Sequence, residues 1–130
     1  MNNKQLIQQV FKEVMENLSV DPEIIGRFFS QDYIQHVDGK VLNYADFVRH
    51  MNALAGATAT LTISVHTIVA EGEIVFTNHH VDGYLKNGKR VEGQVIAEFR
   101  VRDGKICSCD ELTRMVAGGD EARDLGSRMD

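Results

Sequence analysis

A period of two in the side chains begins at residues 61–69, which read LTISVHTIV. A period of two is typical of a β-strand with one buried face. The alternation continues to about residue 115 and is interrupted at three turn signals, Glu71-Gly72-Glu73, Asn87-Gly88 and Asp103-Gly104. The sequence therefore predicts four antiparallel strands joined as a meander, over approximately 59–70, 74–85, 91–102 and 105–115.

The residues before this sheet follow a helical period instead. Apolar residues over 6–18 recur at spacings of three and four, which predicts an amphipathic helix. Asp21-Pro22 predicts the start of a second, shorter helix, which is followed by an extended segment over 30–37. A third helix is expected over 44–56, between a capping asparagine and a terminal glycine. Helices followed by strands predict an α+β fold.

Composition places the chain among ordinary globular domains. It has 130 residues, of which 43% are hydrophobic and 25% charged, so it is long enough to bury its own core. The formal net charge of −5 excludes a basic, phosphate-tracking surface as the leading hypothesis, and we expect no nucleic-acid partner. We expect a single domain over 1–130, with a charged C-terminal arm over 118–130.

The sequence predicts no membrane span and no secretory leader. The most apolar segment, 61–70, is interrupted by polar residues, and residues 1–5 lack the basic and apolar regions of a signal peptide. Cytoplasmic residence is the expectation that follows. Cys107 and Cys109 are too close together to close a useful loop and lack two further zinc ligands, so we expect reduced thiols, no metal site and no cofactor.

Three segments resemble a known family: FFSQDYIQH at 28–36, EGEIV at 71–75 and EFRVRDGKI at 98–106. Together with the order of the elements, they resemble the SnoaL-like branch of the nuclear transport factor 2-like superfamily. The resemblance implies a cone-shaped, cystatin-like fold in which three N-terminal helices pack on a curved antiparallel sheet. It also implies a pocket between the helices and the concave face of the sheet. Because this scaffold carries cyclases, isomerases, dehydratases, epoxide hydrolases and binding modules, the chemistry must come from the residues of the pocket.

A sheet-mediated homodimer is a further implication of the resemblance. Antiparallel sheets can leave one face free for a partner. The expected dimer surface is the outward face that bears Thr62, Ser64, Glu98 and Arg100.

His36 is the candidate catalytic base. It lies on the extended segment, where the similar ketosteroid isomerases carry the carboxylate that moves the proton, and an imidazole titrates near neutral pH. Asp38 is placed either to orient the ring or simply to form a turn. The alternative for His36 is a structural histidine that shapes the pocket wall.

His79 and Asp110 are the other candidate catalytic residues. Consecutive strand residues face opposite sides, so one of His79 and His80, and one of Asp110 and Glu111, should enter the pocket. Strand parity favours His79, and an inward carboxyl at Asp110 or Glu111 would supply an acid opposite His36. A histidine pair at a dimer interface and a solvated carboxylate are the alternatives. Of the remaining histidines, His50 and His66 are expected at the surface or at an interface.

The expected ligand-binding residues are Tyr33, Phe28, Phe47, Ala97 and Phe99. Ala97 stands where the similar isomerases carry an aspartate, and the first helix offers no tyrosine, so steroid isomerisation by their mechanism is not expected. We therefore predict a protein that binds a small, largely apolar organic ligand and performs acid-base proton transfer, such as cyclisation, isomerisation or dehydration. The alternative is a non-catalytic ligand-binding or dimeric interaction module.

Overall fold

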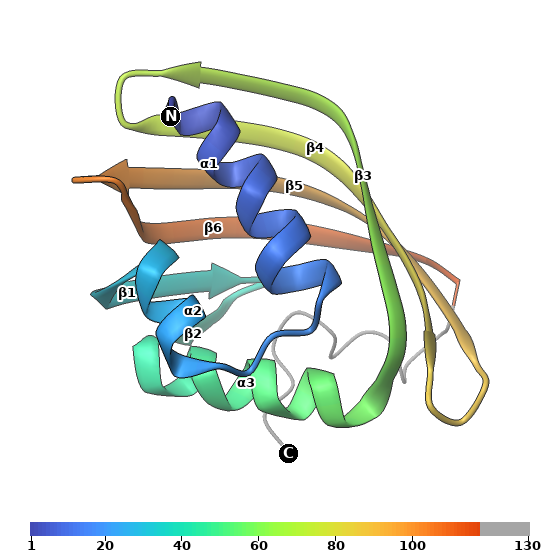
Figure 1. Ribbon diagram of the computed structural model, residues 1–130. Coiled ribbons are helices and arrows are strands. Elements are labelled where there is room, and N and C mark those ends of the chain that lie inside the picture. The colour runs from blue at the N-terminus through green and yellow to red at the C-terminus, as the bar shows by residue number, and fades with distance from the viewer. Residues whose placement is uncertain (118–130) are drawn as a thin grey trace.

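The helices lie in the first half of the chain, with two strands between the second and the third, and four long strands of a curved sheet follow (Figure 1). A computed structural model describes residues 1–117, so the expected arm over 118–130 lies outside the described residues. In chain order the elements are α1 (Asn3–Val10), the π-helical segment η1 (Phe11–Glu16), α2 (Pro22–Phe28), β1 (Phe29–Val37), β2 (Lys40–Leu42), α3 (Tyr44–Ala57), β3 (Thr58–Glu71), β4 (Ile74–Leu85), β5 (Arg90–Arg102) and β6 (Lys105–Ala117). The predicted α+β order is confirmed.

The helices α1, α2 and α3 begin at side-chain caps. Asn2 accepts a hydrogen bond from the Gln5 N–H at 2.8 Å, and Asn43 accepts one from the Asp46 N–H at 2.9 Å. Asp21 does the same for α2, just before its first-turn proline. These bonds satisfy N–H groups that have no partner within the helix. The predicted starts of the second and third helices are confirmed, and α3 ends one residue later than expected.

The first helix changes its hydrogen-bond pattern in its second half. The sequence predicts one regular amphipathic helix, but residues 11–16 form the π-helical segment η1. A π-helical turn is wider than an α-turn and is frequent at functional sites. Here Phe11 and Met15 of η1 line the interior cavity described below, while Val14 is fully buried.

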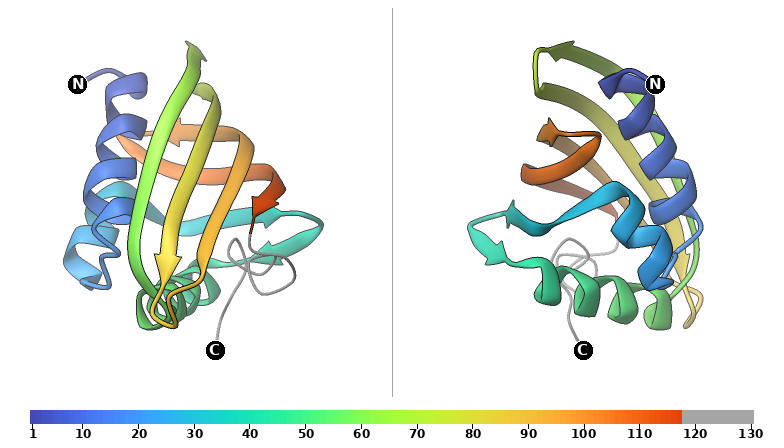
Figure 2. Two further views of the ribbon diagram at one scale, coloured as in Figure 1. Left: turned by 90° about the vertical axis from the view of Figure 1, so that its right-hand side faces the viewer. Right: turned by 60° about the vertical axis from the view of Figure 1, so that its left-hand side comes forward.

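Within residues 1–117, six strands form one sheet in the order β2-β1-β6-β5-β4-β3. The strands β3 to β6 are antiparallel neighbours, as the turn signals predict. β1, predicted only as an extended segment, pairs in parallel with β6, and the short β2 pairs with the other edge of β1. Figure 2 shows the sheet curling toward the helices, which lie on its concave side.

A β-bulge changes the parity of β3. Val65 pairs with His79, but the next partner of β4 is Thr67, so His66 is skipped. The expected inward face is therefore confirmed only as far as Val65. Beyond the bulge, Ile68 packs against the core and Val69 is 54% exposed.

The core forms where α1, η1 and α3 meet the concave face. Ile7, Met51, Val75 and Ile106 come from four different elements and are all fully buried. Each large apolar side chain buried in this way stabilises the fold by about 1.5–3 kcal/mol relative to an exposed one. In the part of the chain that the structure describes, no helix is long and apolar enough to cross a membrane.

Gly83 generates the first testable prediction. A Cβ at this position would lie 2.3 Å from the backbone oxygen of Thr60, a contact that requires the paired strands to shift. We expect Gly83→Ala to lower the free energy of unfolding by about 1–3 kcal/mol, measured by urea denaturation. Gly56→Ala in α3 is the matched control, because a Cβ there meets nothing within 4 Å and should raise helix stability by up to about 1 kcal/mol. Equal stability of both variants would contradict the close strand approach at Gly83.

Candidate functional site

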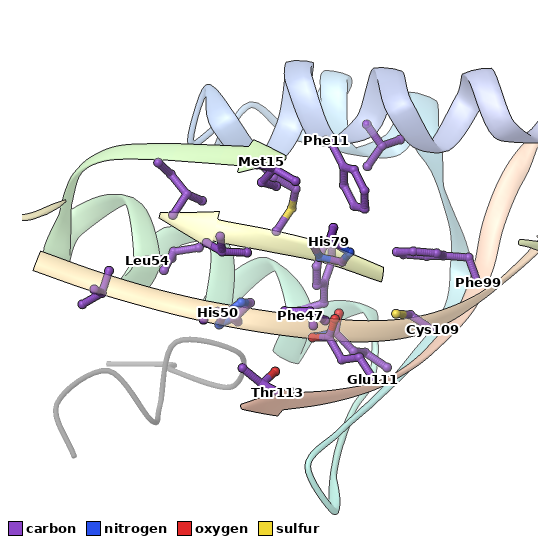
Figure 3. Close-up of a pocket in the computed structure, with 18 of the residues that line it drawn as sticks. Phe11, Met15, Phe47, His50, Leu54, His79, Phe99, Cys109, Glu111 and Thr113 are labelled. Atoms are coloured by element: carbon purple, nitrogen blue, oxygen red, sulfur yellow. The ribbon is translucent and has the colours of Figure 1, made fainter. Parts of the chain in front are cut away.

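A cavity of about 110 Å³ lies between the helices and the concave face of the sheet. Its walls are mainly apolar and aromatic, with Phe11 and Met15 on the helix side (Figure 3). The polar side chains that line it include Gln35, His50, His79 and Glu111. An apolar hollow with a few convergent polar groups is the usual form of a small-molecule site.

The structure brings His79, Tyr33, Phe47 and Phe99 of the expected site residues to this cavity. Phe28 and Ala97 are buried but are not among the lining residues, so their expected contact with a ligand stays a prediction. Phe28 packs in the core from the end of α2.

His36 does not face the cavity. Its side chain is exposed, whereas its neighbours Gln35 and Val37 on β1 are buried. Along an alternating strand, Tyr33, Gln35 and Val37 share the inward face, so the imidazole must point outward. The prediction that His36 lines the cavity is therefore wrong. Tyr33 and Val37 are an even number of residues apart and share the inward face, so the odd-numbered spacing to His36 would have excluded it.

Asp110 is also on the outer side of the sheet. It pairs with His36 across the β1–β6 ladder, so the two expected partners are neighbours outside the cavity. Glu111 is the inward member of the pair Asp110 and Glu111. The placement of Asp110 as the pocket acid is therefore wrong, and that of His79 as the inward histidine is right.

The carboxyl of Glu111 is held at the end of a hydrogen-bonded chain. The Tyr33 hydroxyl donates to Gln35 Oε1 at 2.8 Å, and Gln35 Nε2 donates to Glu111 Oε1 at 3.4 Å. Burial, and then the nearby carboxylates of Asp38 and Asp110, raise the pKa of Glu111 to about 7. Near neutral pH this carboxyl is therefore present in both protonation states, which suits a general acid-base group.

The pKa of His79 is shifted in the opposite direction. Its ring is 4% exposed and lies 4.6 Å from the Phe11 ring, measured between centroids. Burial lowers the pKa of His79 to about 4, so the imidazole is neutral at neutral pH. The Thr77 hydroxyl hydrogen-bonds His79 Nδ1 at 2.8 Å, which fixes the plane of the ring.

Cross-strand register orders the inward-facing residues into rows. We name three of them after one member each: the Glu111 row (Thr77, Ala97, Glu111), the His79 row (His79, Val95, Thr113) and the Gly93 row (Val81, Gly93, Met115). Successive rows are two residues, or about 7 Å, apart. His79 and Glu111 stand on either side of β5, two strand spacings across the sheet and one row along it, or about 12 Å apart, and both point into the cavity (Figure 3).

Three residues of the site were missed or placed at the surface by the sequence reasoning. Gln35 shares the parity of Tyr33, and Cys109 shares that of Glu111. His50 is 2% exposed and lines the cavity, so its expected surface position is wrong. It lies three residues after Phe47 and four before Leu54, which is the spacing of one helix face. Among residues 1–117, no group of three or more His, Cys, Asp and Glu is placed to hold a metal ion.

The second prediction concerns the pH dependence of stability. Between about pH 4.5 and 7 the folded protein keeps the Glu111 proton that the unfolded chain loses, so this residue lowers the free energy of unfolding as pH rises. We expect Glu111→Gln to remove this loss and to be more stable than the wild type at pH 8, by at most about 3 kcal/mol. The measurement is urea denaturation at a series of pH values from 4.5 to 8.

His79→Gln supplies a control of opposite sign. The pKa of His79 is lower in the folded state, so its contribution is present above pH 6.5 and is lost as pH falls toward 4. The stability of this variant relative to the wild type should therefore rise as pH falls. Parallel stability curves for the wild type and Glu111→Gln would contradict a carboxyl buried in the cavity.

Comparison with known proteins identifies the family. The SnoaL-like domain family matches residues 9–109. An uncharacterised protein of Schizosaccharomyces pombe is 36% identical over 126 residues, which cover 97% of this chain and 96% of that protein.

Solved structures share the architecture at lower identity. AclR, a candidate hydroxylase from Streptomyces galilaeus, has a TM-score of 0.75 at 21% identity, covering 98% of this chain and 86% of that chain. IdmH, a candidate polyketide cyclase from Streptomyces antibioticus, has a TM-score of 0.71 at 17% identity, covering 84% and 89%. An M. tuberculosis LEH-like epoxide hydrolase also gives 0.71 at 17% identity, covering 85% and 81%. These likenesses concern the fold. With the family match over most of its length, the chain belongs to the SnoaL-like domain family and has the cone-shaped nuclear transport factor 2-like fold.

Proposed function

We propose that this protein binds a small, largely apolar carbonyl compound and moves a proton on it, with Glu111 as the catalytic acid-base. The observation that carries the proposal is a carboxyl with a pKa of about 7, held by Gln35 at the wall of an apolar cavity. An apolar cavity of 150 Å³ binds benzene, so a cavity of about 110 Å³ suits a ligand near the size of a single ring.

The proposed reaction is a proton transfer between two carbon atoms. The Glu111 carboxylate accepts a proton from the carbon next to the ligand carbonyl, and the electron pair of that C–H bond moves toward the carbonyl oxygen to give an enolate. The protonated Glu111 then returns the same proton to another carbon of the conjugated system. The net change is an isomerisation that consumes no further reactant.

His79 would stabilise the charge that develops on the carbonyl oxygen. When the Thr77 hydroxyl donates to Nδ1, the ring proton is on Nε2, which becomes a donor. A neutral imidazole can polarise a carbonyl in this way, and no buried positive charge is required. The opposite placement of His79 and Glu111 across β5 supports this division of roles.

The fold-level comparisons are compatible with this class of reaction. IdmH, the candidate polyketide cyclase, has the same architecture, although 17% identity transfers no residue role to this chain. The proposal keeps the acid-base proton transfer that the sequence suggested. It assigns the catalytic base to Glu111 instead of His36.

The third prediction tests this chemistry with a ring-sized probe. The reaction is the conversion of cyclohex-3-enone to cyclohex-2-enone, followed by the ultraviolet absorbance of the conjugated product. We expect Glu111→Gln to lower the rate at least a hundredfold, since general base catalysis contributes about 10²–10⁴. The wild-type rate should rise with pH through about 7, where Glu111 loses its proton.

His36→Ala is the matched control for this measurement. The His36 side chain is exposed on the opposite face of the sheet, so this variant should keep the wild-type rate. Loss of activity in His36→Ala together with an unchanged rate in Glu111→Gln would reverse the assignment.

We also propose that the convex face of the sheet forms a homodimer. Ile96 and Leu112 are opposite each other on β5 and β6 and are 44% and 68% exposed. Phe76, on β4, is 43% exposed and belongs to the neighbouring row on the same face. Exposed apolar side chains on adjacent strands favour contact with another protein surface, and an identical face is self-complementary under twofold symmetry.

The fourth prediction is the solution mass, measured by size-exclusion chromatography with light scattering. We expect a dimer for the wild type and a monomer for Leu112→Glu, because burying an unpaired carboxylate at the centre of the contact is unfavourable. Val20→Glu, in the loop between η1 and α2, is the control and should remain dimeric. A monomeric wild type would contradict the proposed contact.

A further inference from the structure

Gly93 is a position on the cavity wall of β5 without a side chain. Val91 and Val95, two residues away on either side, point to the same concave face and are buried. Gly93 itself lines the cavity between them. A glycine inside a strand costs stability, and it often marks a place where a ligand approaches the backbone closely.

The backbone does not require glycine at this position. A Cβ on Gly93 would have its nearest contacts at 3.5 Å, with the Arg114 carbonyl oxygen and Met115 Sδ, which is ordinary van der Waals distance. Gly83 differs, because there a Cβ would collide with the Thr60 carbonyl oxygen. The glycine therefore keeps the cavity wall flat beside Met115, where a methyl group would touch without a clash, whereas the missing side chain at Gly83 permits strand pairing.

This part of the wall begins where the polar part of the cavity ends. The Gly93 row is about 7 Å beyond the His79 row and about 13 Å beyond the Glu111 row. Its other members, Val81 and Met115, are apolar, and Leu54 and Leu61 line the same cavity. A ligand whose carbonyl lies between Glu111 and His79 would therefore meet mainly apolar side chains beside Gly93.

We propose that Gly93 determines specificity by setting the length of the apolar group that the cavity accepts. The ligand is then a neutral carbonyl compound with an unbranched apolar substituent on the side away from the oxygen. This inference rests on the proposed carbonyl-binding function of the same cavity. A side chain larger than methyl at position 93 would occupy the place of the substituent and leave the site of the carbonyl unchanged.

The probes are cyclohexanone and the 4-methyl and 4-ethyl cyclohexanones, with dissociation constants measured by calorimetry. We expect the wild type to bind each longer member more tightly, by about fourfold for each added methylene that becomes buried. Gly93→Ala, Gly93→Val and Gly93→Leu should lose this gain progressively. In Gly93→Leu, 4-ethylcyclohexanone should bind at least tenfold more weakly than in the wild type, while cyclohexanone binds within twofold.

Ala70→Val on β3 is the matched control, since it adds a β-branched side chain at an exposed strand position outside the cavity. It should keep the full dependence on chain length, and thermal unfolding checks that each variant is folded. Affinity that is independent of chain length in the wild type, or a full gain in folded Gly93→Leu, would overturn the inference on Gly93 and leave the result for Glu111→Gln standing. Failure of every cyclohexanone to bind the wild type would overturn both proposals.

Discussion

The register between β4, β5 and β6 is the constraint on which the site depends. Side chains alternate between the two faces of each strand, and cross-strand pairing fixes which inward residues share a row. A slip of one residue in β6 would replace Glu111 by Asp110 and move every apolar partner to the outer face. Because the concave face is packed against the helices, such a slip would expose core residues such as Ile106 and Cys109. The free energy gained by burying the core side chains therefore also determines which side chains line the cavity.

Local patterns predicted the parts of the molecule that local forces determine. The alternation over β4 to β6 and over β3 as far as Val65, the turn glycines, and the caps at Asp21 and Asn43 depend on neighbouring residues alone, and the structure confirms them. The inward direction of His79 follows from the same alternation. The bulge at His66 was not visible, because a skipped residue depends on the pairing of two strands.

The site was predicted less well because a family position was given priority over strand parity. The extended segment that contains His36 was predicted at the right residues. The face of the sheet on which the His36 side chain lies, however, follows from the parity of Tyr33 and Val37. Asp110, the neighbour of His36 on β6, could not be predicted from the sequence, because the parallel ladder joins segments more than seventy residues apart. Cytoplasmic residence and the absence of a cofactor stay predictions.

The chain of hydrogen bonds from Tyr33 to Glu111 has a built-in direction. A carboxamide has one oxygen that only accepts and one nitrogen that only donates. Because the phenol donates to the oxygen of Gln35, the amide nitrogen is turned toward the carboxyl, and a flipped amide would place its oxygen against the ionised form of Glu111. The side chain at position 35 therefore works as a polarised spacer that aims Glu111 before any ligand arrives. A glutamate at position 35 would have nearly the same shape, but its two carboxylate oxygens are equivalent acceptors and would not orient Glu111 in this way.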